Sequence, residues 1–180
     1  MIYKFVVGSE EAENFKLVIA IDSDDTFDRL RNVILDAVGY NKEQMDSFYI
    51  CDDEWNKVNE VTYMDMDLDT EDDVWIMEDT HLSELIEDEG QKLKFVFDYM
   101  TERYFYMRLK EVIPGKSLRD PLCERKEGKA PVEMIDIDAY GDKFAKIDTT
   151  IDDLDAEFYG DESFDEEEIS DLEELEEDSL

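Results

Sequence analysis

The acidic stretch Asp65–Asp73 is a candidate cation site. Its first, third and fifth residues are aspartates, which is the spacing of calcium ligands in an EF-hand loop. That loop needs a glycine at its sixth position and a bidentate glutamate at its twelfth, but these positions hold Thr70 and Ile76. The departures favour a solvated acidic loop, and weak divalent-cation binding by Asp65–Asp73 is the alternative that the spacing leaves open.

Histidine and cysteine are too sparse for a dedicated metal site. The chain has one histidine, His81, and two cysteines, Cys51 and Cys123, with no Cys-x-x-Cys or His-x-x-x-His pair. A structural zinc site takes four such ligands. No glycine-rich phosphate-binding loop occurs either. We therefore predict no metal site and no cofactor.

One small group of residues suggests catalysis. Asp98 lies in the apolar run Phe95–Tyr99, and a carboxyl group held in an apolar pocket can serve as a general acid or base. Cys123 has basic neighbours in the sequence, which lower the pKa of a thiol. A site near Asp98, Arg103 and Cys123 is the enzymatic alternative. The competing interpretation is an inert thiol and an Asp98 that faces solvent or pairs with Arg103, as the period-two pattern indicates.

The elements that would position these residues begin with a β-hairpin and a helix. Apolar residues form extended runs at 2–7 and 15–21, separated by a short polar link, which is the pattern of a hairpin. Apolar residues then recur at helical spacing from Phe27 to Val38. Asp25 or Thr26 can cap the start of this helix, and Gly39 suits its end.

The rest of the predicted domain contributes one more helix and further strands. The strands are expected at 48–50, 58–63, 93–99 and 105–109. A second helix is expected to begin after Asp79 or Thr80 and to end at Gly90, whereas residues 114–146 are expected to form loops. The order ββα-β(β)-αββ predicts an α+β fold, in which a mostly antiparallel sheet carries two main helices on one face and an acidic C-terminal tail follows.

Charge divides the chain into two regions. The sequence contains 53 Asp and Glu against 18 Lys and Arg, for a formal net charge of −35. Residues 147–180 hold 17 of the acidic residues and no Lys or Arg, so they carry −17 and residues 1–146 carry the remaining −18. We therefore predict a folded domain at 1–146 and an acidic tail at 147–180.

Apolar residues interrupt the acidic tail. They are Phe158, Tyr159, Phe164, Ile169, Leu172 and Leu175. The last three are spaced by three residues and would share one face of a helix. Two interpretations stay open: the tail is a solvated, disordered segment that aids solubility, or these residues bind a basic protein partner as the tail folds onto it.

The charge also excludes classes of partner. A strongly acidic chain repels phosphate groups, so we expect no direct nucleic-acid binding and no membrane docking. No apolar run is long enough to span a bilayer, and the N-terminus lacks the features of a secretory signal. Two cysteines are too few for a disulfide framework, which predicts a cytoplasmic protein with reduced thiols.

Several segments of the chain resemble a known family. These segments are Leu82–Gly90, Leu93–Tyr99, Pro121–Cys123 and Gly128–Pro131. They are similar to the plasmid Ri ORF-three-like family, whose members are also labelled passenger proteins of an insertion element. The resemblance covers about residues 1–135 and implies an α+β fold of unestablished biochemical role.

The chain departs from this family at one place. The family has a tyrosine-aspartate-aromatic-glycine-aspartate segment that is followed by a tryptophan and a histidine. Asp98 occupies the first aspartate position, but Met100 stands where glycine is usual, and the tryptophan-histidine pair is missing around Tyr104–Met107. A site that the family builds there would lack those groups in this chain.

These observations lead to one main hypothesis about function. We predict a non-enzymatic, acidic interaction protein that binds a basic protein partner, because complementary charge gives fast and salt-dependent association. Nucleic-acid mimicry, in which carboxylates stand in for phosphates, is one form of this function. The sequence predicts neither the partner nor the oligomeric state.

Overall fold

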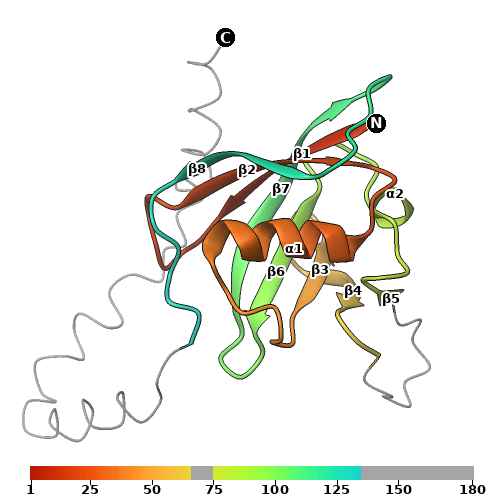
Figure 1. Ribbon diagram of the computed structural model, residues 1–180. Coiled ribbons are helices and arrows are strands. Elements are labelled where there is room, and N and C mark those ends of the chain that lie inside the picture. Colours follow the sequence, from red (N-terminus) through yellow and green to blue (C-terminus); the bar gives the residue numbers. More distant parts are fainter. Residues whose placement is uncertain (66–74, 135–180) are drawn as a thin grey trace, which may run out of the picture. The chain divides into compact units, whose positions relative to one another are not determined.

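The computed structural model describes residues 1–65 and 75–134, and Met1–Met134 forms one compact unit. The described elements are β1 (Ile2–Gly8), β2 (Lys16–Asp22), α1 (Phe27–Val38), β3 (Ser47–Cys51), β4 (Lys57–Thr62), β5 (Trp75–Ile76), α2 (Leu82–Leu85), β6 (Lys92–Asp98), β7 (Arg103–Ile113) and β8 (Leu122–Glu127). All eight strands belong to one sheet in the order β5-β4-β3-β6-β7-β1-β2-β8, with α1 across one face (Figure 1).

The sheet is antiparallel at every strand pair except β4 with β5. Hairpins join β1 to β2, β3 to β4, and β6 to β7, and the long β7 pairs with both β6 and β1. The structure thus confirms the predicted α+β class with a mostly antiparallel sheet. In the described part of the chain, no helix is long and apolar enough to cross a membrane.

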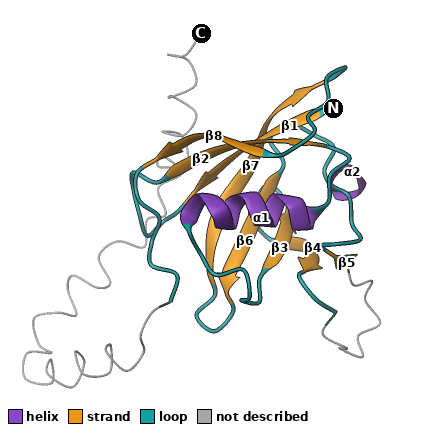
Figure 2. Cartoon of the chain, viewed as in Figure 1, coloured by secondary structure: helices purple, strands orange, loops and turns teal. Residues whose placement is uncertain are grey.

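Helix α1 forms where its sequence predicts it. The Thr26 side chain accepts a hydrogen bond from the Arg29 amide at the N-terminus, and Gly39, at φ 74°, ends the helix with its N–H bonded to the Leu35 carbonyl. The apolar side of α1 packs on the aromatic core of the sheet, with the rings of Phe27 and Phe48 5.4 Å apart. Figure 2 shows the helix lying over the middle strands.

The second helix is much shorter than predicted. Only the single turn Leu82–Leu85 is helical, and Ile86 is already extended. The carbonyl of Leu85 accepts a hydrogen bond from the Gln91 side chain at 2.8 Å, and the carbonyl of Ile86 accepts one from the Tyr3 hydroxyl at 2.8 Å. These tertiary donors take the carbonyl groups that a longer helix would use for its own hydrogen bonds, so the expectation that it ends at Gly90 was wrong.

The edge strand β8 lies in a region that was expected to form loops. Leu122–Glu127 pairs with β2, and Cys123 stands opposite Ile19. The strand escaped prediction because most of its side chains are exposed or charged, and Cys123 is the residue of this strand that packs against the core. Backbone pairing with β2 therefore holds β8 in place, and pairing of this kind leaves little hydrophobic pattern in the sequence.

Candidate functional site

Asp98 and Arg103 lie together at the turn between β6 and β7. The Asp98 carboxylate accepts hydrogen bonds from the amide of Met100 at 3.0 Å and from the hydroxyl of Thr101 at 2.7 Å. Its Oδ2 atom is 4.0 Å from Nη1 of Arg103. These contacts make Asp98 the residue that closes the turn, in the manner of an aspartate that bonds to backbone two residues ahead.

Arg103 fixes two distant segments on the start of β7. Its Nε and Nη2 atoms donate to the carboxylate of Glu11 at 2.7 and 2.6 Å, which is a bidentate ion pair. Its Nη2 also donates to the carbonyl of Val132 at 2.6 Å, and Nη1 donates to the carbonyl of Glu133 at 3.0 Å. The hydrogen bonds to Glu11 raise the pKa of Arg103 above its ordinary value, so the guanidinium stays charged. The guanidinium is thus a structural clamp that holds residues 132–133.

Cys123 lies apart from this pair. Cys123 on β8 pairs with Ile19 on β2, Ile19 pairs with Phe5 on β1, and Phe5 pairs with Leu109 on β7. Cys123 is therefore level with Leu109 across the sheet. Leu109 is six residues beyond Arg103 along β7, which corresponds to about 20 Å of extended strand. The structure therefore brings Asp98 and Arg103 together but places Cys123 in another part of the sheet.

The two thiols are not activated. Burial raises the pKa of Cys123, and backbone hydrogen bonding at Arg125 and Val18 together with the charge of Lys126 only partly offsets this effect. Burial also raises the pKa of Cys51. A nucleophilic cysteine needs a lowered pKa, so neither environment favours the thiolate.

The other predicted site residues fall largely beyond the described chain. Phe158, Tyr159, Phe164, Ile169, Leu172 and Leu175 all lie outside the described residues, as does the proposed boundary at residue 146. Of the acidic stretch Asp65–Asp73, the structure describes only Asp65. Within residues 1–65 and 75–134, no group of three or more His, Cys, Asp or Glu side chains is arranged to hold a metal ion.

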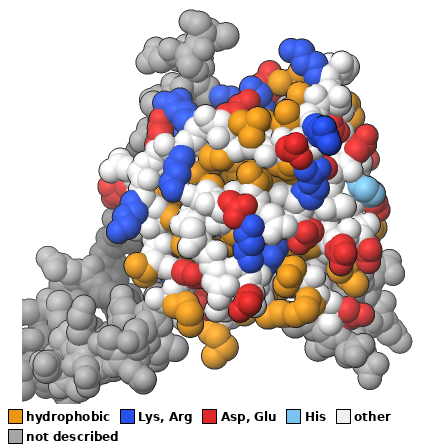
Figure 3. Space-filling model, in the orientation of Figure 1, with side chains coloured by type: hydrophobic (Ala, Val, Ile, Leu, Met, Phe, Trp, Pro, Cys, Tyr) orange, Lys and Arg blue, Asp and Glu red, His pale blue; other side chains and the backbone are white. Residues whose placement is uncertain are grey.

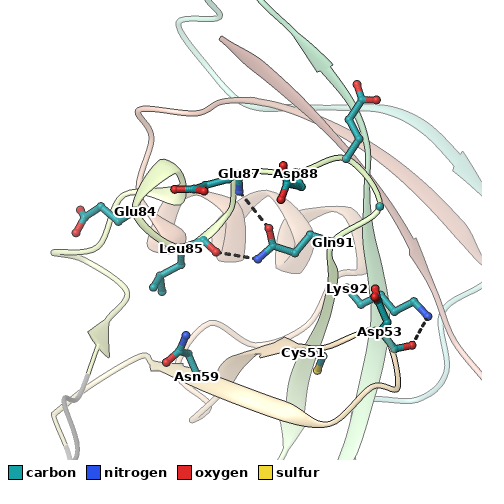
Figure 4. Close-up of a pocket in the computed structure, with 11 residues that line it drawn as sticks. Cys51, Asp53, Asn59, Glu84, Leu85, Glu87, Asp88, Gln91 and Lys92 are labelled. Carbon is teal, nitrogen blue, oxygen red and sulfur yellow. Dashed lines mark hydrogen bonds between the residues drawn. The ribbon is translucent and has the colours of Figure 1, made fainter.

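A shallow acidic hollow opens on the described surface. Its volume is about 550 Å³, and three segments line it: the β3–β4 hairpin, the α2 turn and the link into β6 (Figure 4). The acidic lining residues are Asp53, Glu84, Glu87, Asp88 and Glu89, and all of them are exposed. We call these five residues, with the space between them, the acidic hollow.

Hydrogen bonds hold the walls of the acidic hollow. Gln91 donates from its side-chain amide to the Leu85 carbonyl at 2.8 Å and accepts from the Glu87 amide at 3.1 Å. Lys92, the one basic residue of the lining, donates to the backbone carbonyl of Asp53 at 2.8 Å. Lys92 thus joins the two walls through the backbone of Asp53 and not through a carboxylate. With five acidic residues and one lysine in its lining, the hollow has a negative net charge.

A charge run in the sequence could have revealed this hollow. Residues 58–91 contain 13 Asp and Glu and no Lys or Arg, and this stretch is nearly four times as long as Asp65–Asp73. In the structure this run includes β5 and α2, and Figure 3 shows both acidic and basic side chains near the one histidine. Sequence reasoning selected only the middle of the run because that part has the spacing of a calcium loop.

Together, the fold and the site define an α+β protein whose mostly antiparallel sheet carries one main helix and whose surface has an acidic hollow. The chain belongs to the plasmid pRiA4b ORF-3-like protein family, whose model matches residues 15–173. This confirms the resemblance in the sequence. The match extends beyond residue 135, so it also takes in most of the acidic residues 147–180.

A solved structure supports the fold alone. The chain is similar to the crystal structure of a protein of unknown function from Methanosarcina mazei Go1, with 11% sequence identity and a TM-score of 0.57. The similarity covers 87% of this chain and 86% of that one. No curated protein matches the sequence significantly.

Proposed function

We propose that this protein is a non-enzymatic interaction protein whose acidic hollow binds a basic segment of a protein partner. The observation that carries the proposal is the composition of the hollow, in which five exposed carboxylates surround one lysine that is bonded to a backbone carbonyl. A Lys- or Arg-rich segment would place ammonium or guanidinium groups among these carboxylates. Complementary charge of this kind speeds association and fixes orientation.

The described residues offer better support for binding than for catalysis. Asp98 is engaged in its turn, Arg103 is engaged with Glu11 and two carbonyl groups, and both thiols have a raised pKa. Cys51 and Cys123 are free thiols, which supports our placement of the protein in a reducing compartment such as the cytoplasm. Nucleic-acid mimicry remains one form of the proposed function, with carboxylates in the place of phosphates.

The test uses a synthetic ten-residue peptide of alternating Lys and Arg as the probe. Isothermal titration calorimetry would measure its binding to the full chain and to the double variant Glu87→Gln/Asp88→Asn. Exposed ion pairs contribute about 0.2–1 kcal/mol each, so losing two should weaken binding about 2- to 30-fold. Binding should also weaken as salt increases, because the charges are exposed.

A matched control separates a site from a general charge effect. The double variant Glu13→Gln/Glu43→Gln removes the same charge from exposed positions outside the hollow. It should bind the peptide nearly as well as the natural chain does. Equal weakening by both double variants would show that the peptide responds only to net charge, and the proposal would then be wrong.

A further inference from the structure

One amide side chain in the lining of the acidic hollow has no partner. Asn59 lies on β4, opposite Ile50 on β3 and two residues before the fully buried Val61. Residues two apart on a strand share a face, so Asn59 points to the same side of the sheet as Val61, at the rim of the core. Its side chain is half-buried and makes no hydrogen bond to any residue that the structure describes. Figure 4 shows this side chain pointing into the hollow.

Two of the five acidic residues of the hollow already hold the backbone. The Oε1 atom of Glu84 accepts a hydrogen bond from the His81 amide at 2.9 Å, which caps the α2 turn. The Oε1 atom of Glu89 accepts a hydrogen bond from the Val112 amide at 2.8 Å. These two carboxylates add negative charge to the hollow, but one oxygen atom of each is engaged in the fold.

The other three carboxylates are open to a ligand. The side chains of Asp53, Glu87 and Asp88 are exposed, and they make no hydrogen bond or ion pair with any part of the chain that the structure describes. Asp53 belongs to the β3–β4 hairpin, whereas Glu87 and Asp88 belong to the link between α2 and β6. Hydrogen-bond acceptors without partners therefore stand on both walls of the hollow.

An apolar side chain and a fixed lysine complete the lining around Asn59. Leu85 is half-buried and lies on the wall opposite Asn59 in Figure 4. Lys92 lies at the other end of the hollow, where its ammonium group donates to the Asp53 carbonyl and is 5.0 Å from the ring centroid of Trp55. A cation beside Asn59 would thus meet an apolar wall and open acceptors at a distance from the charge of Lys92.

We propose that Asn59 makes the acidic hollow select an arginine side chain of the partner over a lysine side chain. This inference rests on the proposed function, because it names the basic group that the hollow takes. The planar guanidinium group has five N–H donors, so it can donate to the Asn59 amide oxygen on one wall and to the carboxylates of Glu87 and Asp88 on the other. Its aliphatic stem would lie along Leu85. An ammonium group is compact and more strongly hydrated, so it gains less from acceptors on two walls.

Three peptides compare the basic groups at equal charge. Each has ten residues, in which glycine alternates with arginine, with lysine or with dimethylated arginine. In calorimetry with the full chain, the arginine peptide should bind at least about fivefold more tightly than the lysine peptide, because one guanidinium group reaches both walls. Dimethylation keeps the charge but blocks bidentate hydrogen bonding, so the methylated peptide should bind about as weakly as the lysine peptide.

The peptide series separates this inference from the proposed function. If the arginine and lysine peptides bind equally well, the inference is overturned while the proposed function stands. If neither peptide binds, both the proposed function and the inference are wrong. Because this comparison uses the natural chain, it does not depend on the folding of any variant.

A pair of variants tests the role of Asn59. Asn59→Ala removes the open amide and should bring the affinities for the arginine and lysine peptides to within about twofold of each other. Gln44→Ala removes a half-buried amide outside the hollow and should keep the full preference for arginine. A preference that survives Asn59→Ala, or one that both variants lose, would contradict the inference.

The side-chain amide signals of Asn59 locate the guanidinium group directly. In the isotope-labelled natural chain, these NMR signals should move when the arginine peptide is added, since the amide oxygen accepts a hydrogen bond. The lysine peptide should move them less at equal saturation. Asn59 signals that stay unchanged while the arginine peptide binds would place the guanidinium group elsewhere and overturn the inference.

Discussion

Gly128 offers the sharpest test of the way in which β8 is held. Its φ is +66°, and a Cβ atom added there would lie 2.1 Å from the Asn14 carbonyl oxygen and 2.9 Å from the Phe15 amide nitrogen. Gly115 has a similar φ of +72°, but its Cβ would meet nothing within 4 Å. Alanine at either position costs about 1–2 kcal/mol for the left-handed backbone. At Gly128 alone, backbone atoms must also move.

The two substitutions therefore form a matched pair. Overpacking against rigid neighbours adds about 1–3 kcal/mol, so Gly128→Ala should lose about 2–5 kcal/mol of unfolding free energy. Gly115→Ala should lose only the cost of the left-handed backbone, which is about 1–2 kcal/mol of unfolding free energy. Urea denaturation followed by circular dichroism measures both, and the midpoint of thermal unfolding should fall by roughly 2–4 °C for each kcal/mol. Losses that agree within about 0.5 kcal/mol would refute the close approach of Gly128 to Asn14.

Three further predictions concern charge and reactivity. Iodoacetamide at pH 7.5 should modify Cys123 more slowly than free glutathione, because burial raises the pKa of the thiol; an equal or faster rate would contradict this. Burial acts to raise the pKa of Asp22, but hydrogen bonds from the Leu118 and Asp24 amides and the N-terminal ammonium lower it overall. Asp22 therefore stabilises the fold above its unfolded pKa of about 3.9, and this stability is lost as pH falls through the lower folded pKa. Asp22→Asn should flatten the acid dependence of the unfolding free energy, and an unchanged profile would exclude this role. Arg103→Lys replaces a bidentate fork by a single ammonium and should cost about 1–3 kcal/mol in the same denaturation assay. No loss would show that the clamp adds no stability.

Local patterns in the sequence are sufficient to predict the hairpins and α1. Side chains alternate along β6 and β7, and Thr26 and Gly39 mark the ends of α1. These signals are local because a strand face or a helix cap is defined by residues a few positions apart. The short α2 was not predictable in this way, since the Tyr3 hydroxyl that bonds the Ile86 carbonyl is 83 residues away.

The candidate sites likewise depend in part on the sequence alone and in part on the tertiary structure. Net charge and the charge run 58–91 follow from the sequence alone, and so does the acidity of residues 147–180. The sequence also brought Asp98 and Arg103 to attention, and they do meet across one short turn.

The sequence by itself therefore determined the class of fold, the strong α1 and the excess of negative charge, because each depends on composition or short-range spacing. The tertiary structure alone decided that Arg103 clamps residues 132–133, that Cys123 lies far from Asp98, and that acidic residues from separate segments line one hollow. Strand order and register set which of these side chains meet and which stay apart, and no local pattern specifies which strands become neighbours.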